Sequence, residues 1–89
     1  MENDVISAFA NPVRLKLLCC LSKGKKNVQE LIENCGLAQS AVSQHLIKLK
    51  KAGLVIDEKE GKFIYYTIKF TESAKIAHRL HKFAEEFSK

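Results

Sequence analysis

The chain has few prolines, glycines and cysteines, and it lacks long apolar runs. Its 89 residues hold one proline, four glycines and three cysteines. No low-complexity stretch or internal repeat divides it, so we expect one domain over residues 1–89. No apolar run is long enough to span a bilayer. The first residues begin acidic and lack the basic segment of a secretory signal.

The few cysteines, Cys19, Cys20 and Cys35, form no regular framework. An odd number without a framework favours a reduced, cytoplasmic setting. Cys19 and Cys20 are adjacent and project about 100° apart on a helix, so they cannot easily bond to each other. A buried free cysteine is usually a small hydrophobe, which is the interpretation we favour for Cys19. We expect Cys35 to be more exposed and do not assign it as a sensor.

Catalytic constellations are missing as well. The chain has no Ser-His-Asp set, paired carboxylates or glycine-rich phosphate loop in a plausible context. Ser43 and His45 stand two apart on one expected helix, where side chains diverge. We therefore expect neither an enzyme nor a cofactor.

What the chain does have is positive charge and a modest apolar content. The formal net charge is +5, which suits a polyanionic partner such as nucleic acid. Hydrophobic residues make up 46% of the chain. That share is enough for a small core, and oligomerisation is a common source of extra stability for so small a domain.

Two helices open the expected fold. The first covers about Asn3–Ala10. In "NPVRLKLL", Asn11 caps the second helix and Pro12 takes its first position, where a missing N–H costs nothing. The second helix runs to about Ser22, and Gly24 closes it. Its apolar residues fall on two sides, so it should lie between two layers. The residues expected to be buried are Val5, Ile6 and Phe9 in the first helix, and Leu15, Leu17, Leu18, Cys19 and Leu21 in the second.

The next two helices form a compact pair. In "NVQELIENCG", Asn27 caps the third helix, Glu30 is its reciprocal partner, and Gly36 ends it. Only a few residues precede the fourth helix, about Gln39–Ala52, which Gly53 stops. Helix, tight turn and helix is the geometry of a helix-turn-helix unit.

The hydrophobic period then changes to that of strands. Leu54–Glu58 and Lys62–Ile68 are rich in β-branched and aromatic residues, with Glu60 and Gly61 at the tip of a hairpin. A last helix begins near Thr71. The order α-α-α-α-β-β-α predicts a mainly α winged helix-turn-helix with a small β-hairpin. The last helix carries a narrow apolar stripe with the spacing of a helix that packs on another helix: Ile76, Leu80, Phe83 and Phe87.

The fourth helix has two unlike faces. Val42, Leu46 and Leu49 form a stripe to be buried, while the other side has polar side chains near its start and lysines near its end. A helix fits the major groove of DNA, and its N-terminal residues reach base edges. A solvated surface face is the alternative. The expected DNA-binding residues are Gln39, Ser40, Ser43, Gln44, Lys48 and Lys51, with Lys59 and Lys62 beside the hairpin tip.

The segments "NPVRLKLL", "LAQSAVSQHLIKLKKAGLV" and "GKFIYYTI" resemble the ArsR/SmtB winged-helix repressors of bacteria and archaea over nearly the whole chain. The resemblance implies a homodimer built on its first and last helices, which sits on a promoter operator and leaves when an effector binds. Two residues depart from the family pattern. Ala38 replaces a capping serine, which weakens the helix start, and Ile47 replaces a basic residue, so that it touches a thymine methyl or lowers affinity. The recognition positions implied are Gln39, Ser40, Ser43, Gln44 and His45.

The expected function is thus a dimeric, sequence-specific DNA-binding regulator, most simply a repressor on an inverted-repeat operator. A winged-helix module that binds protein is one alternative. Another is a thiol- or metal-responsive repressor with a non-standard sensing site. The residues expected at the dimer interface are Ile6, Phe9, Ile76, Leu80, Phe83 and Phe87.

The effector sites of the resembling family are incomplete in this chain. The metal-binding cysteines at the start of the third helix are absent, and we assign no metal. His78, His81 and Glu85 form a feasible ligand face, but it points away from the apolar stripe, so we favour surface histidines. Another branch senses oxidants or persulfide through cysteines on the second and last helices. Cys19 matches the first position and is left as a possible thiol sensor, but Lys82 stands near the second.

Overall fold

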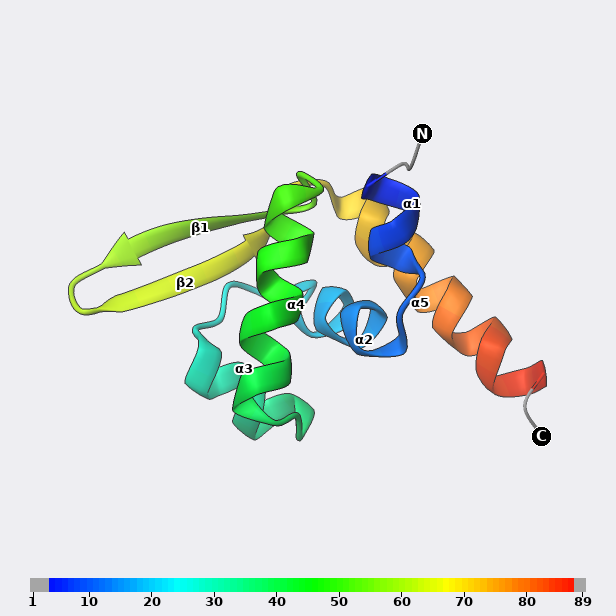
Figure 1. Cartoon of the computed structure of the whole chain (residues 1–89), viewed down its shortest axis with the longest axis horizontal. Helices are drawn as coiled ribbons and strands as arrows, with labels where there is room; N and C mark the ends of the chain where they lie inside the picture. The colour runs from blue at the N-terminus through cyan, green and yellow to red at the C-terminus, as the bar shows by residue number, and fades with distance from the viewer. Residues whose placement is uncertain (1–3, 88–89) are drawn as a thin grey trace.

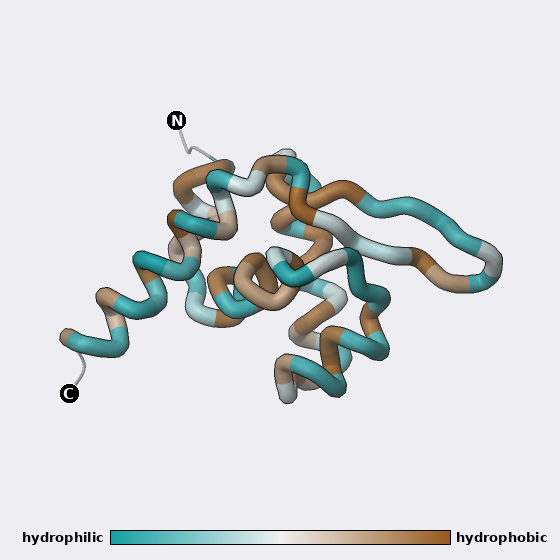
Figure 2. Tube along the Cα trace, turned by 180° about the vertical axis from the view of Figure 1, so that it is seen from behind, coloured by the Kyte–Doolittle hydropathy of each residue, from teal (hydrophilic) through white to brown (hydrophobic). Residues whose placement is uncertain are grey.

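Helices and an antiparallel hairpin follow one another in the predicted order (Figure 1). The computed structural model describes residues 4–87, so the expected helix start at Asn3 lies outside the described residues. The hairpin of residues 55–68, which we call the wing, and the last helix, α5 (Thr71–Phe87), extend in opposite directions (Figures 1 and 2). The whole structure measures 43 × 31 × 23 Å. The elements are α1 (Asp4–Phe9), α2 (Pro12–Leu21), α3 (Val28–Cys35), α4 (Gln39–Lys51), β1 (Val55–Glu60), β2 (Phe63–Ile68) and α5 (Thr71–Phe87).

The predicted helix caps of α2 and α3 are confirmed. The side-chain oxygen of Asn11 accepts hydrogen bonds from the backbone N–H groups of Val13 and Arg14, at 2.9 and 3.2 Å. Asn27 and Glu30 form the reciprocal capping box, in which each side chain accepts the other residue's backbone N–H. Because these caps satisfy N–H groups that lack a partner within the helix, they determine where α2 and α3 begin.

The turn between α3 and α4 is short because Gly36 adopts a left-handed conformation, with φ of 66°. Glycine reaches this region without steric cost. Two residues, Leu37 and Ala38, then lead directly into α4. Ala38 makes no side-chain capping bond, as the departure from the family pattern predicts. The two helices therefore form the predicted helix-turn-helix unit.

The hairpin is longer at its tip than the sequence pattern predicts. The register runs from Val55 opposite Ile68 to Glu60 opposite Phe63, so β1 ends at Glu60 and not at Glu58. A two-residue turn remains, and Gly61 supplies its positive φ of 63°. The loop before α3 joins the sheet, because the backbone groups of Lys26 and Tyr66 exchange two hydrogen bonds of 3.0 and 2.8 Å.

Helix α2 lies between two layers, as its two apolar sides predict. It packs against α3 and α4 on one side and against α5 on the other. The inner face of α5 consists of small residues, so its backbone comes close to α2. These small residues are Ser73, Ala74 and Ala77. The largest fully buried side chains are Leu17, Leu18, Leu21, Leu31, Val42, Leu46, Leu49 and Val55.

The burial expected in the first helix is wrong for the single chain. Val5 is 42% exposed and Ile6 is 68% exposed, whereas Ala8 is 3% exposed. Phe9 is partly buried against the core. Helix α1 has only six residues. Its last turn packs against the core, and its first apolar residues stay on the surface.

The cysteines pair in a way that the sequence does not predict. Cys20 of α2 and Cys35 at the end of α3 form a disulfide. Cys35 is 5% exposed, so the expected exposure is also wrong. Packing of α3 on α2 brings the two residues together across 15 positions of sequence. The bond fastens the C-terminal end of α3, directly before the turn into α4, to α2.

None of the helices in the described part of the chain is long and apolar enough to cross a membrane.

Candidate nucleic-acid interface

The rotation of α4 is determined by its apolar stripe. Val42, Leu46 and Leu49 are at most 1% exposed. Burial of this stripe turns the opposite face of the helix to solvent. The exposed side chains of α4 include every non-histidine residue predicted there to contact DNA: Gln39, Ser40, Ser43, Gln44, Lys48 and Lys51.

The exposed face of α4 suits a polyanion. The helix contains no carboxylate, and its last turn carries three lysines. Glutamine can pair with adenine through two hydrogen bonds, and serine can bond a base or a phosphate. Ile47 lies in the middle of this face and is 67% exposed, where an apolar side chain can touch a thymine methyl.

The wing adds two exposed lysines, Lys59 and Lys62, beside its tip. The Nζ of Lys62 lies 5.6 Å from the centre of the Phe63 ring. Strand β1 also carries carboxylates, which would repel a phosphate backbone. Two of them are neutralised by ion pairs: Asp57 with Lys50 at 2.9 Å, and Glu60 with Lys25.

Those ion pairs also brace the wing. Lys50 comes from α4 and Lys25 from the loop before α3, so the wing is tied to α4 and to the loop that leads into α3. The Nζ of Lys25 also lies 5.1 Å from the centre of the Tyr65 ring. The sequence pattern does not reveal Lys25, because a lysine in a loop gives no sign of its partner.

His45 does not belong to the exposed face, which corrects its assignment as a DNA-contacting residue. It is partly buried, and its Nδ1 lies 3.1 Å from Nη1 of Arg14. Because the arginine can only donate, this nitrogen is the acceptor. His45 therefore joins α4 to α2 and does not stand with Gln44 on the outer side.

Arg14 is the buried charge that organises this region. It is 6% exposed, and its hydrogen bonds go to two backbone carbonyls and a histidine ring, none of which is an acid. Its Nε and Nη2 donate to the carbonyl oxygens of Ala8 and Ser7, at 3.0 and 2.9 Å, in the last turn of α1. A cation is favoured at the C-terminal end of a helix. One guanidinium thus connects α1, α2 and α4.

The unfolding free energy should fall as the pH drops below about 6.5, the ordinary pKa of histidine. Burial lowers the pKa of His45 in the folded chain, and the nearby Arg14 and Lys48 lower it further. Below pH 6.5 the unfolded chain therefore binds more protons at His45 than the folded chain does, so acid favours unfolding. Above pH 6.5 His45 is neutral in both states, and its contribution to the unfolding free energy no longer changes with pH. Urea titrations of the wild type and His45→Asn from pH 7.5 to 5 measure it. A wild type whose pH dependence equals that of the variant would contradict this effect.

The structure gives little support to a thiol or metal sensor. Burial raises the pKa of the Cys19 thiol, although the Lys23 ammonium lowers it, and a raised pKa reduces thiol reactivity. Cys19 is the free cysteine of the described residues, since the other two are bonded. His81 pairs with Glu85 at 3.0 Å. Residues 4–87 contain no group of three His, Cys, Asp or Glu side chains that could hold a metal ion.

Comparison with known families and proteins agrees with this geometry. The family model described as "Bacterial regulatory protein, arsR family" matches residues 11–57. The transcriptional activator HlyU of Vibrio cholerae is 40% identical over 78 residues, which span 88% of this chain and 72% of HlyU. The transcriptional repressor SdpR of Bacillus subtilis is 33% identical over 78% of this chain and 77% of its own.

Solved structures extend the similarity to the whole fold. HlyU from Vibrio cholerae N16961 superposes with a TM-score of 0.76 at 39% identity, over 90% of this chain and 87% of HlyU. The homodimeric winged helix-turn-helix DNA-binding domain of Mb0332 from Mycobacterium bovis gives 0.76 at 31% identity, over 94% of this chain and 78% of that domain. These relatives favour DNA binding over a protein-binding module. The chain belongs to the ArsR family of bacterial regulatory proteins, and it is a DNA-binding transcriptional regulator and not an enzyme.

Proposed function

We propose that the chain is a repressor that binds an imperfect inverted-repeat operator as a homodimer, with residues 1–89 as one DNA-binding domain. Helix α4 of each protomer enters a major groove, and Lys59 and Lys62 of the wing contact the adjacent backbone. The observation that carries the proposal is the exposed, carboxylate-free face of α4. Its polar residues stand at the N-terminal end, where a recognition helix contacts base edges.

The apolar stripe of α5 supports the homodimer. In the single chain Ile76, Leu80, Phe83 and Phe87 are 46%, 39%, 57% and 76% exposed. The rings of Phe83 and Phe87 lie 4.9 Å apart and form one continuous apolar surface. An exposed patch of this kind on a small domain marks an interaction site.

The N-terminal helix continues this surface. Ile6 is 68% exposed, and Phe9 contributes to the lining of two hollows. These two hollows, of about 590 and 280 Å³, are lined by residues of α1 and α5 among others. They give the side chains of a partner protomer places to insert. The winged helix-turn-helix domain of Mb0332 is a homodimer, which supports dimerisation of this chain.

Repression is the simpler outcome for this chain. A dimer seated on a promoter excludes other proteins from the same DNA without needing a second surface. The relatives include both an activator and a repressor by name. We also propose a cytoplasmic location, where the DNA is, and there we expect the Cys20–Cys35 bond to form only under oxidising conditions.

Two substitutions separate base reading from backbone contact. Gln44→Ala should reduce the preference for the operator over random DNA by about 1–3 kcal/mol, because a paired base contact is lost. Lys62→Ala should weaken both DNAs alike and reduce the slope of log affinity against log salt by about 0.9. The operator is first selected from random duplexes by the wild type, and affinities are then measured by fluorescence anisotropy at several salt concentrations.

Lys82→Ala is the matched control, because Lys82 is an exposed lysine of α5 outside the proposed interface with DNA. It should leave the preference unchanged. If Gln44→Ala keeps the full preference, the reading face is assigned to the wrong residues. A wild type with a salt slope near zero, or with one affinity for all sequences, contradicts operator binding as a whole.

A further inference from the structure

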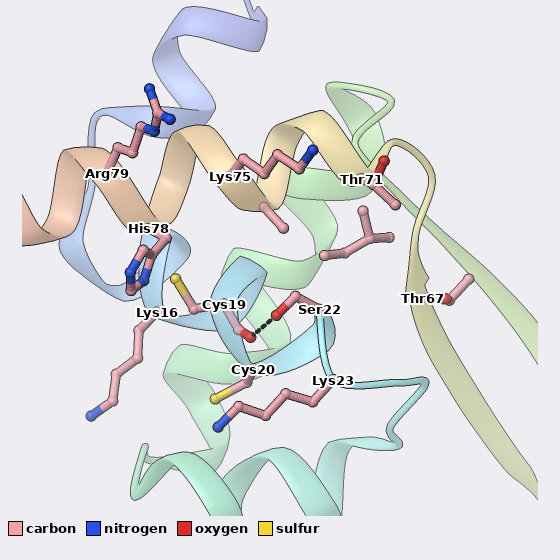
Figure 3. A pocket seen from close by; sticks show the side chains of 12 residues that line it. Lys16, Cys19, Cys20, Ser22, Lys23, Thr67, Thr71, Lys75, His78 and Arg79 are labelled. Atoms are coloured by element: carbon pink, nitrogen blue, oxygen red, sulfur yellow. Dashed lines mark hydrogen bonds between the residues drawn. The ribbon is translucent and has the colours of Figure 1, made fainter.

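A cavity of about 740 Å³ opens between α2, the end of β2 and the first half of α5 (Figure 3). Its volume is that of a typical small-molecule site. It is the largest of the three cavities described for residues 4–87. Neither the DNA-reading face nor the proposed dimer contact accounts for it.

The lining of this cavity is positively charged. The charge comes from Lys16 and Lys23 on the α2 side and from Lys75 on α5. The described residues that line it include no carboxylate. The Lys23 ammonium is close enough to oppose the effect of burial on the Cys19 thiol. Cations gathered at a recess with apolar walls raise the local concentration of anions.

The inner surface of the cavity is less polar than its rim. Ile68 and the buried Ala74 contribute aliphatic surface. Figure 3 shows Cys19 of α2 and His78 of α5 pointing toward one another, whereas Arg79 points away from α2. An apolar recess with a few charged groups at its edge suits a ligand with an apolar body and one charged end.

We propose that this cavity binds a small organic carboxylate, and that its occupancy changes the affinity for DNA. The second part rests on the proposed function. None of the described residues of α4 lines the cavity, so a ligand acts on the reading face indirectly. Helix α2 provides the route, because it packs against α5 on the cavity side and against α4 on the other.

The cavity stays accessible in the proposed dimer. At about 100° per residue, Lys75 and His78 lie roughly 140° and 160° around α5 from Leu80, the centre of the apolar stripe. The ligand and the partner protomer therefore use opposite sides of the same helix. That position allows a bound ligand to change how α5 meets α2 without competing for the dimer contact.

A nuclear magnetic resonance titration with sodium octanoate tests the site directly. Amide signals of the full chain should shift at and beside the lining residues, which fall within residues 16–23, 67–71 and 74–79. Octyltrimethylammonium has the same apolar chain with the opposite charge and should bind at least tenfold more weakly. Equal binding of the two probes would overturn the proposal, as would octanoate shifts confined to the apolar stripe of α5.

Paired variants test the charges. Lys23→Ala/Lys75→Ala should weaken octanoate binding at least fivefold. The matched control Lys69→Ala/Lys82→Ala removes two exposed lysines that do not line the cavity and should bind as the wild type does. Equal loss in both pairs would show that octanoate senses only net charge, which overturns the site.

The regulatory part has its own readout. Saturating octanoate should change the affinity of the wild type for selected operator DNA at least threefold and leave that of Lys23→Ala/Lys75→Ala nearly unchanged. Octanoate that fills the cavity without altering operator affinity would overturn the effector role. If the chain bound octanoate there but no operator, the ligand site would stand and the proposed function would fail.

Discussion

Replacing Leu80 by aspartate should convert the dimer into folded monomers and weaken operator binding at least 100-fold. Leu80 is 39% exposed at the centre of the apolar stripe of α5. A carboxylate placed in an apolar interface loses its hydration without gaining a partner, which costs several kcal/mol. Each monomer retains one recognition helix, but it loses the gain of about 10²–10⁴ in affinity that comes from joining two contacts.

Sedimentation velocity at micromolar concentration measures the change in mass, and circular dichroism checks folding. Lys82→Asp is the control, because it introduces a carboxylate on the same helix, roughly 160° around from Leu80, with a larger change in charge. It should remain dimeric. A folded Leu80→Asp that still dimerises would put the interface elsewhere, and a monomeric wild type would refute the model of two half-sites.

The element order could be predicted because local signals are strong in this chain. Asn11 with Pro12, and Asn27 with Glu30, define helix starts through bonds to nearby backbone, and such bonds depend only on neighbouring residues. The rotation of α4 followed from a stripe of three buried residues, whose spacing is visible in the sequence. The predicted ends of the hairpin strands are less accurate, because the register depends on pairing across strands.

The errors at the cysteines and at His45 concern contacts between distant residues, whereas the error at Val5 and Ile6 comes from the shortness of α1. The Cys20–Cys35 bond and the pairing of Glu60 with Lys25 depend on how helices and wing pack, which no local pattern encodes. His45 was assigned to the reading face by resemblance alone. Its true environment depends on Arg14, 31 residues earlier, and the only sequence signal was a charged residue within the apolar run "NPVRLKLL".

Arg14 has consequences beyond its own position, because its three hydrogen bonds reach elements with different tasks. Helix α1 belongs to the proposed dimer contact, and α4 carries the reading face. The guanidinium donates to the Ser7 and Ala8 carbonyls of α1 and to His45 of α4. A rigid group at this junction fixes the position of the reading face relative to the dimer contact. A dimer that reads two half-sites at a defined spacing requires such a fixed position.

Arg14→Met should lower the unfolding free energy by about 3 kcal/mol. Methionine keeps much of the length of the side chain but leaves the Ala8 carbonyl and the His45 ring nitrogen without this donor, whereas the Ser7 carbonyl still accepts the N–H of Ala10. Each buried group left unsatisfied costs about 1–3 kcal/mol. Urea unfolding at equal protein concentration measures the loss, since the stability of a dimer depends on concentration.

His45→Leu removes one acceptor and should therefore cost less than Arg14→Met. In the double variant the two losses should not add, because the two residues share a bond. The double variant should also keep α4 folded while operator affinity falls, since α1 is no longer held by the carbonyls of its last turn. An Arg14→Met chain as stable as the wild type would show that water replaces the guanidinium. Strict additivity with His45→Leu would show that the Arg14–His45 bond contributes nothing.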